Sequence, residues 1–233
     1  MSSRDLAPRT TDAPADVEIS VIVPVFNEAL NIDDLYARLV PVVPEPAEFI
    51  FIDDGSTDGT AGRLRAIAAT DARVRVVRFR RNFGQTAALS AGIDHAAGDI
   101  IIPMDGDLQN DPADIPQMLA HAVQGDYDVV TGIRQKRKDS LVKKIPSKIA
   151  NFMVRRVTNL DIKDNGCALK VFTKEIAKDL NLYGEMHRFI TLLAHLEGGR
   201  IKQVPVKHHA RNAGVSKYGL ERVFKVVADM MLL

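Results

Sequence analysis

The sequence predicts an α/β fold, in which a parallel sheet is covered by helices on both faces. Short runs of continuous apolar residues, of the length of buried strands, alternate with segments whose apolar residues recur at helical spacing. Polar motifs stand directly after several of these runs, and ligands of such sheets bind at the carboxyl ends of the strands. The pattern therefore also predicts a binding edge.

The first elements are the clearest. Residues 18–25, EISVIVPV, form an almost continuous apolar run and predict a buried strand. A helix follows over residues 28–43, where apolar side chains such as Leu30 and Leu39 recur at helical spacing. Residues 49–52, FIFI, predict a second strand that runs into an Asp-rich turn.

The same alternation continues to residue 131, without an internal repeat. The predicted helices cover residues 60–71, 86–97 and 112–124, and the predicted strands cover 74–79, 99–104 and 127–131. Pro112 falls in the first turn of its helix, where its missing N–H is tolerated.

Length and composition exclude several classes of protein. The chain has 233 residues, enough for one large domain or two small ones. Its 46% hydrophobic and 26% charged residues are ordinary for a globular protein and argue against wholesale disorder. With 31 basic and 30 acidic residues, the overall charge does not indicate a nucleic-acid binder. The single cysteine, Cys167, excludes an internal disulfide framework.

Neither end of the chain reads as a targeting signal. Residues 1–17 are polar and contain proline, which predicts a disordered tail rather than a secretory signal. No run of about 18 apolar residues is present, so none predicts a membrane span. The chain stops inside an apolar run at 226–233, which either packs on the domain or precedes a longer membrane segment.

Two carboxylates follow the predicted strand 99–104. Asp105 and Asp107, separated by Gly106, are side chains at i and i+2 that point the same way on an extended segment. Such a pair can hold Mg²⁺ or Mn²⁺ and leave room for diphosphate oxygens, and Gln109 adds a third oxygen ligand. An Asp-x-Asp alone is common in solvated turns, but its position after a buried strand favours a metal site.

Acidic residues also follow the first two strands. Asp53 and Asp54 end the second strand, where a carboxylate can accept hydrogen bonds from a base or a ribose, and Asp58 is expected to cap the next helix. Glu28 either begins a helix or contacts a nucleotide. The chain has neither the G-x-G-x-x-G pattern of dinucleotide sites nor a P-loop.

Together these motifs resemble glycosyltransferase family 2 over residues 18–225. They read PVFNE at 24–28, IDDGSTDGT at 52–60 and MDGDLQ at 104–109. Two later motifs, YGEMHRF at 183–189 and RNAGVSKYG at 211–219, resemble the polyprenyl-phosphate glycosyltransferase branch, which includes dolichol-phosphate mannose synthase. The resemblance implies the GT-A fold, with a Rossmann-like, mostly parallel sheet, and inversion at the anomeric carbon. It also implies a nucleotide-sugar donor, a divalent metal and a membrane lipid phosphate as acceptor.

The family's site residues carry over onto matching positions. The nucleotide-sugar site would consist of Pro24, Phe26, Glu28, Asp53, Asp54, Asp105, Gly106, Arg134, Arg211 and Lys217. The metal site would consist of Asp105, Asp107 and Gln109, and the acceptor-phosphate site of Arg134, His187, Arg188 and Ser216. Packing is the alternative role for His187. Two departures are visible: Phe26 replaces a common Tyr, and NGCALK at 165–170 stands where many relatives have Ser-Gly-Phe-Arg, so those relatives do not predict the sugar.

The implied chemistry needs cations more than a strong base. A departing nucleoside diphosphate gains negative charge, so a metal on Asp107, together with Arg211 and Lys217, would be catalytic. A lipid monophosphate has a second pKa of about 6 and is largely a dianion at pH 7, so it needs no strong base. Asp164 is the candidate acidic group near the reacting centre, and a turn-forming role for it stays open.

The segment 133–160 suggests a membrane surface. Nine basic residues and one acidic residue lie between Arg134 and Arg156, and an amphipathic helix is predicted after Pro146. A core helix with a solvated face is the alternative. The expected organisation is a disordered tail at 1–17, a catalytic domain at 18–218 and the start of a juxtamembrane amphipathic helix at 219–233. The resemblance and these segments predict association with the cytoplasmic face of the cell membrane.

Other readings stay open. A family 2 enzyme that acts on a sugar hydroxyl would need a strong base and would not need the basic residues. A non-enzymatic binder of nucleotide-sugars or membranes would have no use for the acidic motifs. His208 and His209 would point to opposite sides of a strand, which disfavours a shared metal site. Cys167 is expected to be a small buried residue. The motifs leave open the sugar, the base, and whether the chain forms a homo-oligomer.

Overall fold

The structure, a computed structural model, describes residues 17–135 and 162–210. Several predicted features lie outside the described residues: the tail up to residue 16, most of the basic segment (136–161), and residues 211–233, with the C-terminal helix, Arg211, Ser216 and Lys217. Among the described residues, no helix has both the length and the apolar character needed to cross a membrane.

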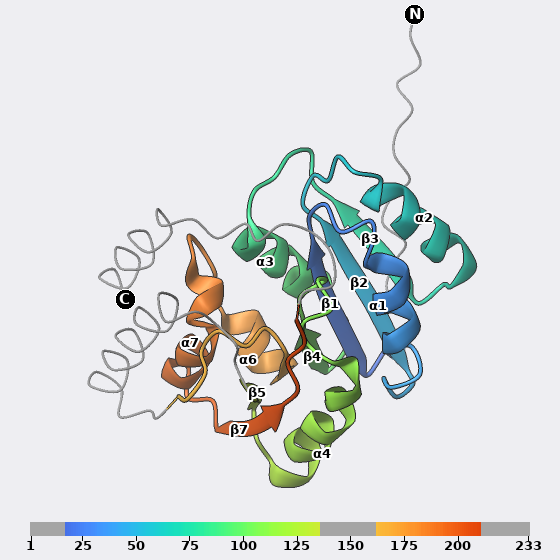
Figure 1. The fold of residues 1–233 in the computed structure, drawn as a ribbon. Helices are drawn as coiled ribbons and strands as arrows, with labels where there is room; N and C mark the ends of the chain where they lie inside the picture. The colour runs from blue at the N-terminus through green and yellow to red at the C-terminus, as the bar shows by residue number, and fades with distance from the viewer. Residues whose placement is uncertain (1–16, 136–161, 211–233) are drawn as a thin grey trace, which may run out of the picture.

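The described residues form one sheet of seven strands in the order β3-β2-β1-β4-β6-β5-β7 (Figure 1). The strands are β1 (Ile19–Val25), β2 (Ala47–Asp53), β3 (Val74–Arg78), β4 (Ile100–Pro103), β5 (Val129–Arg134), β6 (Lys170–Thr173) and β7 (Ile201–Val206). β6 runs antiparallel to both of its neighbours, β4 and β5, whereas all the other neighbouring pairs are parallel. The expectation of an α/β fold with a mostly parallel sheet is confirmed.

Helices cover both faces of this sheet (Figure 1). They are α1 (Ile32–Leu39), α2 (Thr60–Thr70), α3 (Gln85–His95), α4 (Ile115–Gly125), α6 (Lys174–Asp179) and α7 (Ile190–Leu196), with short 3₁₀ turns η1 (Pro112–Asp114) and η2 (Met186–Arg188). Alternate residues of β1 point to opposite faces: Val23 packs in a cluster with Leu35 of α1, and Ile22 packs in another with Leu89 of α3. Because both faces are buried, the central strands read as continuous apolar runs.

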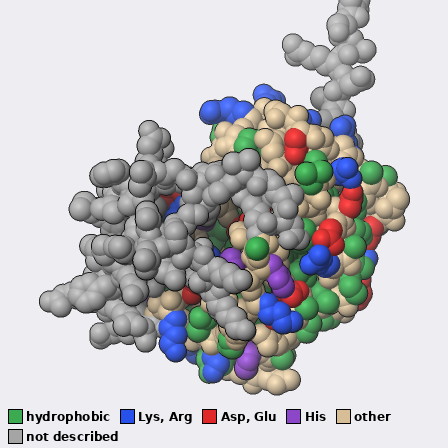
Figure 2. Space-filling view, in the orientation of Figure 1, with side chains coloured by type: hydrophobic (Ala, Val, Ile, Leu, Met, Phe, Trp, Pro, Cys, Tyr) green, Lys and Arg blue, Asp and Glu red, His purple; other side chains and the backbone are tan. Residues whose placement is uncertain are grey.

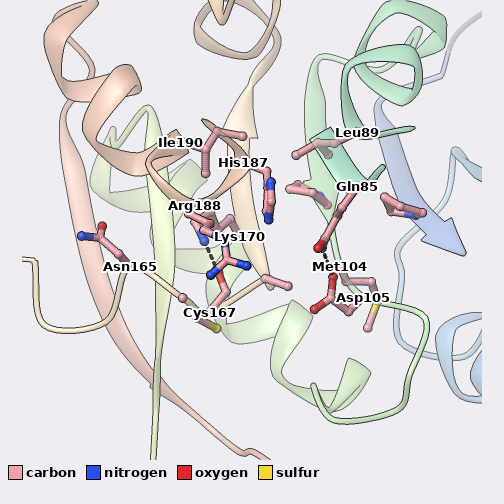
Figure 3. Close-up of a pocket in the computed structure, with 14 residues that line it drawn as sticks. Gln85, Leu89, Met104, Asp105, Asn165, Cys167, Lys170, His187, Arg188 and Ile190 are labelled. Atoms are coloured by element: carbon pink, nitrogen blue, oxygen red, sulfur yellow. Dashed lines mark hydrogen bonds between the residues drawn. The ribbon is translucent and has the colours of Figure 1, made fainter. Parts of the chain in front are cut away.

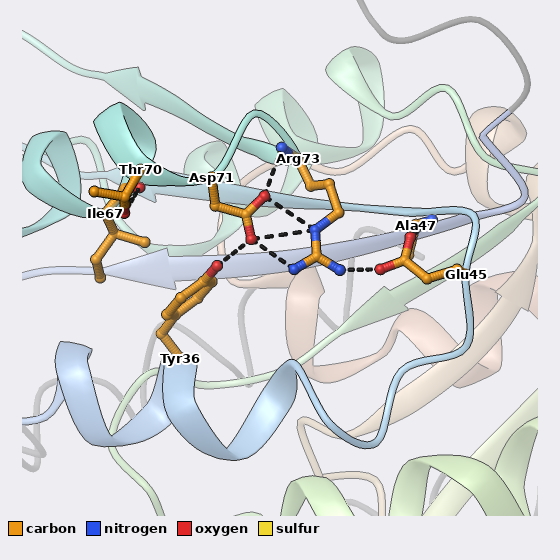
Figure 4. Close-up of polar contacts among 7 residues, drawn as sticks. All are labelled: Tyr36, Glu45, Ala47, Ile67, Thr70, Asp71 and Arg73. Carbon is orange, nitrogen blue, oxygen red and sulfur yellow. Dashed lines mark hydrogen bonds and ion pairs between the residues drawn. The ribbon is translucent and has the colours of Figure 1, made fainter.

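A polar cluster holds the sheet at the amino ends of β2 and β3 (Figure 4). Arg73 binds Asp71 through its Nη2 at 2.6 Å and also pairs with Glu45 in the loop before β2. The Tyr36 hydroxyl of α1 donates a hydrogen bond to Asp71, and burial is the main cause that raises the pKa of this tyrosine. This cluster lies at the opposite end of the strands from the predicted binding edge, so we interpret it as structural.

Acidic and basic side chains are interspersed on the surface of α1 and α2 (Figure 2). Arg38 pairs with Asp34 at 2.7 Å one turn along α1, and Arg63 of α2 pairs with Asp33 of α1. Pairs as exposed as these contribute little to stability. The surface formed by α1 and α2 is therefore solvated and carries charges of both signs.

The first predicted helix is wrong at both ends. It was expected over 28–43, but α1 spans only Ile32–Leu39, and Leu30 is 78% exposed instead of facing the core. The loop before α1 is held by the following turn, because Asp58 accepts a hydrogen bond from the Ala29 N–H at 3.1 Å. The helix is therefore shorter than its apolar spacing suggested.

Candidate functional site

The predicted binding edge is present at the carboxyl ends of β1, β2 and β4. Val25 at the end of β1 is in register with Asp53 at the end of β2, and the Met104 N–H donates a hydrogen bond to the carbonyl of Ile22. The three motifs that follow these strands therefore meet at one edge of the sheet. The prediction that they converge is confirmed by the topology.

The loops after β1 and β2 are bound to each other. The side-chain oxygen of Asn27 accepts a hydrogen bond from the Thr57 N–H at 2.8 Å, and the Asn27 N–H donates to the Ser56 hydroxyl at 2.9 Å. Asn27 adopts φ +54°, a left-handed conformation that asparagine tolerates better than most residues. Glu28 is buried, and its Oε2 accepts a hydrogen bond from Asn31 at 2.6 Å. The helix start foreseen for Glu28 is wrong, because α1 begins only at Ile32, and the nucleotide contact stays a prediction.

Asp53 and Asp54 are buried and face backbone groups. Asp53 accepts a hydrogen bond from the Ser56 N–H at 2.8 Å and pairs with Arg78 at 3.3 Å. The two oxygens of Asp54 accept the N–H groups of Phe83 at 2.7 Å and Gly84 at 2.9 Å. Asp54 thus holds the loop before α3, a role that sequence reasoning did not foresee.

Gly55, which follows Asp54, allows the same loop to approach closely. A Cβ atom at this position would lie 2.5 Å from the carbonyl carbon of Arg81, and the residue adopts φ +74°. Both the space and the conformation therefore require glycine here. The second acidic motif and the loop before α3 form one packed unit.

The Asp-Gly-Asp motif lies in the loop after β4. Asp105 Oδ1 accepts a hydrogen bond from Nε2 of Gln85 at 2.7 Å (Figure 3). Asp107 Oδ1 accepts one from the Gln109 N–H at 3.2 Å, and the Gln109 amide donates to the carbonyl of His209 at 3.4 Å. Gly106 is buried, and a Cβ there would lie 2.7 Å from a methyl group of Val25.

The donor set of this loop fits a hard divalent cation. Magnesium binds in proteins through one or two carboxylates and completes its shell with waters and substrate phosphates. Asp105 and Asp107 supply two carboxylates, and the part of the chain that the structure describes holds no cluster of three or more His, Cys, Asp or Glu side chains able to bind a metal. Two carboxylates are the number that such a cation takes from a protein, so the donor types of this loop are compatible with it.

A pocket opens between this motif and the segment 165–190 (Figure 3). One wall carries Asp105 together with Gln85 of α3. The other carries Lys170 of β6 and, from η2, His187 and Arg188. The full lining is Pro24, Gln85, Leu89, Pro103, Met104, Asp105, Asn165, Gly166, Cys167, Ala168, Lys170, His187, Arg188 and Ile190. Four predicted site residues, Pro24, Asp105, His187 and Arg188, thus meet in one pocket.

The two residues of the basic wall that were predicted have structural partners as well. His187 Nδ1 lies 2.6 Å from the hydroxyl of Thr86 in α3, and Arg188 pairs with Glu185 at 3.3 Å. Both side chains are partly exposed. They are therefore held in place while remaining accessible to a ligand.

Arg134 and Asp164 form a nearly buried ion pair outside the pocket lining. Two guanidinium nitrogens of Arg134 donate to the two Asp164 oxygens, each at 2.8 Å, and the Arg134 backbone N–H donates to the same carboxylate at 3.1 Å. Asp164 also accepts the N–H of Gly166 at 3.2 Å, as its turn-forming role requires. The two residues were predicted separately, and the structure brings them together.

Cys167 and Lys170, which both line the pocket, are buried side chains. Burial raises the pKa of the Cys167 thiol, which agrees with the expectation of an inert buried cysteine. Lys170 is 2% exposed, and burial is the main cause that lowers its pKa. Sequence reasoning did not select Lys170 or Gln85, since a lone lysine or glutamine in a chain carries no motif.

A sequence profile described as Glycosyl transferase family 2 matches residues 20–180. The chain is 43% identical over 229 residues to the dodecaprenyl-phosphate galacturonate synthase of Rhizobium johnstonii (strain DSM 114642 / LMG 32736 / 3841), with 95% of this chain and 68% of the relative covered. It is 36% identical over 224 residues to the undecaprenyl-phosphate 4-deoxy-4-formamido-L-arabinose transferase of Salmonella choleraesuis (strain SC-B67), with 94% and 68% covered.

Solved structures resemble the fold. The glucosyl-3-phosphoglycerate synthase of Mycobacterium tuberculosis, in complex with Mn²⁺, UDP and glucosyl-3-phosphoglycerate, superimposes with a TM-score of 0.75 at 21% identity. The match covers 94% of this chain and 80% of that chain. At this identity the likeness bears on the fold alone.

Proposed function

The chain belongs to glycosyl transferase family 2, and from this premise we propose that it transfers a sugar from a nucleotide-sugar to a polyprenyl phosphate, with inversion at the anomeric carbon. The observation that carries the proposal is the pocket, with Asp105 on one wall and His187 and Arg188 on the other. A carboxylate wall suits a metal-bound diphosphate, and a basic wall suits a second phosphate. The names of both relatives specify a polyprenyl phosphate, which is the acceptor chemistry proposed here.

The donor side lies at the acidic motifs. Asp105 and Asp107 would hold Mg²⁺ or Mn²⁺, with Gln109 beside them, and a bound cation would offset the charge of the departing diphosphate. The nucleoside would lie along Pro24, Phe26, Glu28, Asp53, Asp54 and Gly106, at the edge formed by β1 and β2. We keep both UDP and GDP as donor nucleotides.

The acceptor side lies at the basic wall. His187 and Arg188 would orient the lipid phosphate, together with Arg134 and with Arg211, Ser216 and Lys217 beyond the described residues. A phosphate oxygen of the acceptor attacks the anomeric carbon from the face opposite the diphosphate. The new carbon–oxygen bond forms as the bond to the nucleoside diphosphate breaks, which inverts that carbon.

No general base is required in this scheme, because a phosphate monoester is largely a dianion at pH 7. A sugar hydroxyl as acceptor would need one, and Asp164 was the candidate. Both oxygens of Asp164 are instead engaged by the guanidinium of Arg134 at 2.8 Å. This pairing supports the lipid phosphate over the hydroxyl acceptor, which is the weaker alternative.

Two finer parts of the proposal concern the place of the reaction and the transferred sugar. A polyprenyl phosphate, undecaprenyl or dolichyl, resides in a membrane, so we propose that the protein works at the cytoplasmic membrane face. The transferred group is a hexose or a closely related sugar. The relatives differ on this point, since one name specifies an acidic sugar and the other a formamido-arabinose.

A binding panel followed by a transfer assay tests the proposal. UDP and GDP are each added to the purified protein with Mn²⁺, Mg²⁺ or EDTA, and the melting temperature is recorded. Ligand at 100 times its Kd adds about 2.7 kcal/mol, which corresponds to roughly 5–11 °C for a chain of this size. One nucleotide is expected to stabilise the protein only with metal.

The transfer assay then uses undecaprenyl phosphate in detergent with labelled sugars on that nucleotide. Asp107→Asn is expected to abolish product while the protein stays folded. Asp99→Asn, which changes an exposed aspartate paired with Lys174, is the matched control and keeps activity. Product formation by Asp107→Asn at the wild-type rate would contradict the metal assignment, and absence of any nucleotide binding would contradict the function.

A further inference from the structure

Lys170 is a buried lysine on the basic wall of the pocket, and the proposed reaction assigns it no role. It is the first residue of β6, which lies between β4 and β5 in the sheet. It lines the pocket, and Figure 3 shows it beside Arg188 and Cys167, across from Asp105. The side chain is only 2% exposed, although lysines are rarely buried without a partner.

The charge of Lys170 is only partly compensated by the protein. Its ammonium donates a hydrogen bond to the backbone carbonyl of Cys167, which uses one of its three N–H groups. Within residues 17–135 and 162–210, no carboxylate lies within 4.0 Å of this ammonium. Asp164 and Asp105 act on it only from farther away, while Arg134 opposes them.

An anion that enters the pocket could therefore pair with the buried ammonium of Lys170. Burial is the largest cause that lowers the pKa of Lys170, because the charged form has lost its hydration. Opposite charges attract far more strongly in such a place than at an exposed lysine. A carboxylate oxygen beside this ammonium would form a charge-assisted hydrogen bond and would favour the charged form of the lysine.

The burial of Lys170 also indicates which anion it would bind, the lipid phosphate or a group on the donor sugar. A lipid phosphate enters with its chain directed out of the pocket, and the partly exposed His187 and Arg188 meet that requirement. The sugar of the donor, in contrast, must lie inside the pocket, because it is joined to the diphosphate at Asp105. A group on the sugar is therefore the one that can reach the buried Lys170.

We propose that Lys170 binds the carboxylate of a uronic acid donor, so that the protein selects a nucleoside diphosphate hexuronate over the corresponding neutral hexose. The inference rests on the proposed function, since it takes the pocket to be the donor-sugar site. It adds the chemical class of the sugar, which the family motifs leave open.

The test compares two donors that differ only at the sugar carboxylate, UDP-galacturonate and UDP-galactose, or the GDP pair if the panel selects GDP. Binding to the full chain is measured by calorimetry with Mn²⁺. Wild type is expected to bind the uronate at least tenfold more tightly. In Lys170→Met, which keeps the length of the side chain, this ratio is expected to fall to within about twofold, while UDP alone binds as in wild type.

Lys178→Met is the matched control. Lys178 also has a pKa lowered chiefly by burial, and its ammonium donates to the carbonyls of Ile93 at 2.6 Å and Asp94 at 3.0 Å, away from the pocket lining. This variant is expected to keep the full preference for the uronate. Circular dichroism of both variants checks that they fold.

Two results would overturn the inference. The first is a wild type that binds UDP with metal but does not prefer the uronate, and this result leaves the proposed function intact. The second is a preference that survives in Lys170→Met. If this variant also binds inorganic phosphate at least tenfold more weakly, Lys170 belongs to the acceptor-phosphate site instead. Failure of any nucleotide to bind would instead contradict the proposed function itself.

Discussion

Gln85 donates a hydrogen bond from Nε2 to Oδ1 of Asp105 over 2.7 Å, and so joins the first residue of α3 to the loop after β4 (Figure 3). The next residue of the helix, Thr86, contacts Nδ1 of His187 at 2.6 Å on the other side of the pocket. The amino end of α3 therefore orients a side chain on each wall. Gln85 binds only Oδ1 of Asp105. By fixing this oxygen, the hydrogen bond also fixes the orientation of Oδ2.

Replacing Gln85 by Leu is expected to weaken binding of the nucleoside diphosphate with Mn²⁺ by roughly ten- to hundredfold. A hydrogen bond to a charged group contributes about 1.5–3 kcal/mol, and its loss lets the Asp105 carboxylate rotate. Titration calorimetry of the nucleotide in the presence of Mn²⁺ measures the effect. Gln117→Leu is the control, because the Gln117 amide donates to the carbonyl of Pro205, outside the pocket lining, and its loss should leave the affinity unchanged. An affinity that stays at the wild-type value in Gln85→Leu would mean that Asp105 needs no such support.

Asp54→Ala is expected to lower the free energy of unfolding by about 3 kcal/mol, or roughly 6–12 °C in melting temperature. The change leaves two N–H groups of the loop before α3 without the carboxylate that now accepts them, at 2.7 and 2.9 Å. Thermal unfolding without nucleotide measures it, with the exposed Asp99→Ala as a control near wild type. If Asp54→Ala melts like wild type but loses nucleotide affinity, the carboxylate acts on the nucleotide and not on the loop.

The fold and half of the pocket could be predicted because their signals are local. The central strands are buried on both faces, so they read as apolar runs, and a motif after such a run must lie at the carboxyl edge. This reasoning located Asp105 and the acidic wall. The residues of the basic wall, His187 and Arg188, came from the family resemblance instead.

The second half of the fold was not predicted, for physical reasons. β6 has only four residues and begins with a lysine, and β7 contains Pro205, which usually argues against a strand. β7 tolerates this proline because it is an edge strand of the sheet. α6 and α7 have six and seven residues, too few for apolar spacing to repeat.

Contacts between distant residues were also beyond the sequence. Gln85 meets Asp105 across 20 positions, and Arg134 meets Asp164 across 30. Nothing in either segment indicates which distant residue its side chain will contact, and only the sheet order brings the pairs together. Lys170 reads as a surface residue for the same reason, since nothing near it in the chain signals burial.

A third prediction concerns the Arg134–Asp164 pair. It asks whether this pair only stabilises the fold or also takes part in the transfer reaction. Arg134→Met is expected to destabilise the protein by about 3–5 kcal/mol, because it leaves the nearly buried Asp164 without its counter-charge. The double variant Arg134→Met with Asp164→Leu is expected to recover much of this stability, as apolar replacements of buried pairs often do. Thermal unfolding and the transfer assay are measured on both.

The transfer assay distinguishes the two possible roles of this pair, support of the fold and contact with the acceptor phosphate. If Arg134 also contacts the acceptor phosphate, the stable double variant should remain at least tenfold less active than wild type. Full activity in the stable double variant would mean that the pair only supports the fold. Arg200→Met, which breaks the exposed contacts with Asp126 and Asp128, is the control and is expected to melt close to wild type.

The last prediction concerns stability and pH at Lys170. Burial lowers the pKa of Lys170 in the folded protein below its usual value of 10.5. Between the two pKa values the unfolded chain binds more protons, so the contribution of this group to stability rises with pH through that window. Lys170→Met removes a buried charge and is therefore expected to melt about 2–4 °C higher than wild type at pH 7, for roughly 1 kcal/mol.

This advantage should shrink as the pH is raised toward 10, because wild type then loses the proton that burial disfavours. Melting curves of both proteins at several pH values between 7 and 10, without ligand, measure the difference. Lys178→Met should show no such gain, since its ammonium is less buried and donates to two carbonyls. A Lys170→Met protein that melts below wild type at pH 7 would mean that the ammonium is already compensated without ligand, and the argument for a carboxylate-binding lysine would lose its energetic basis.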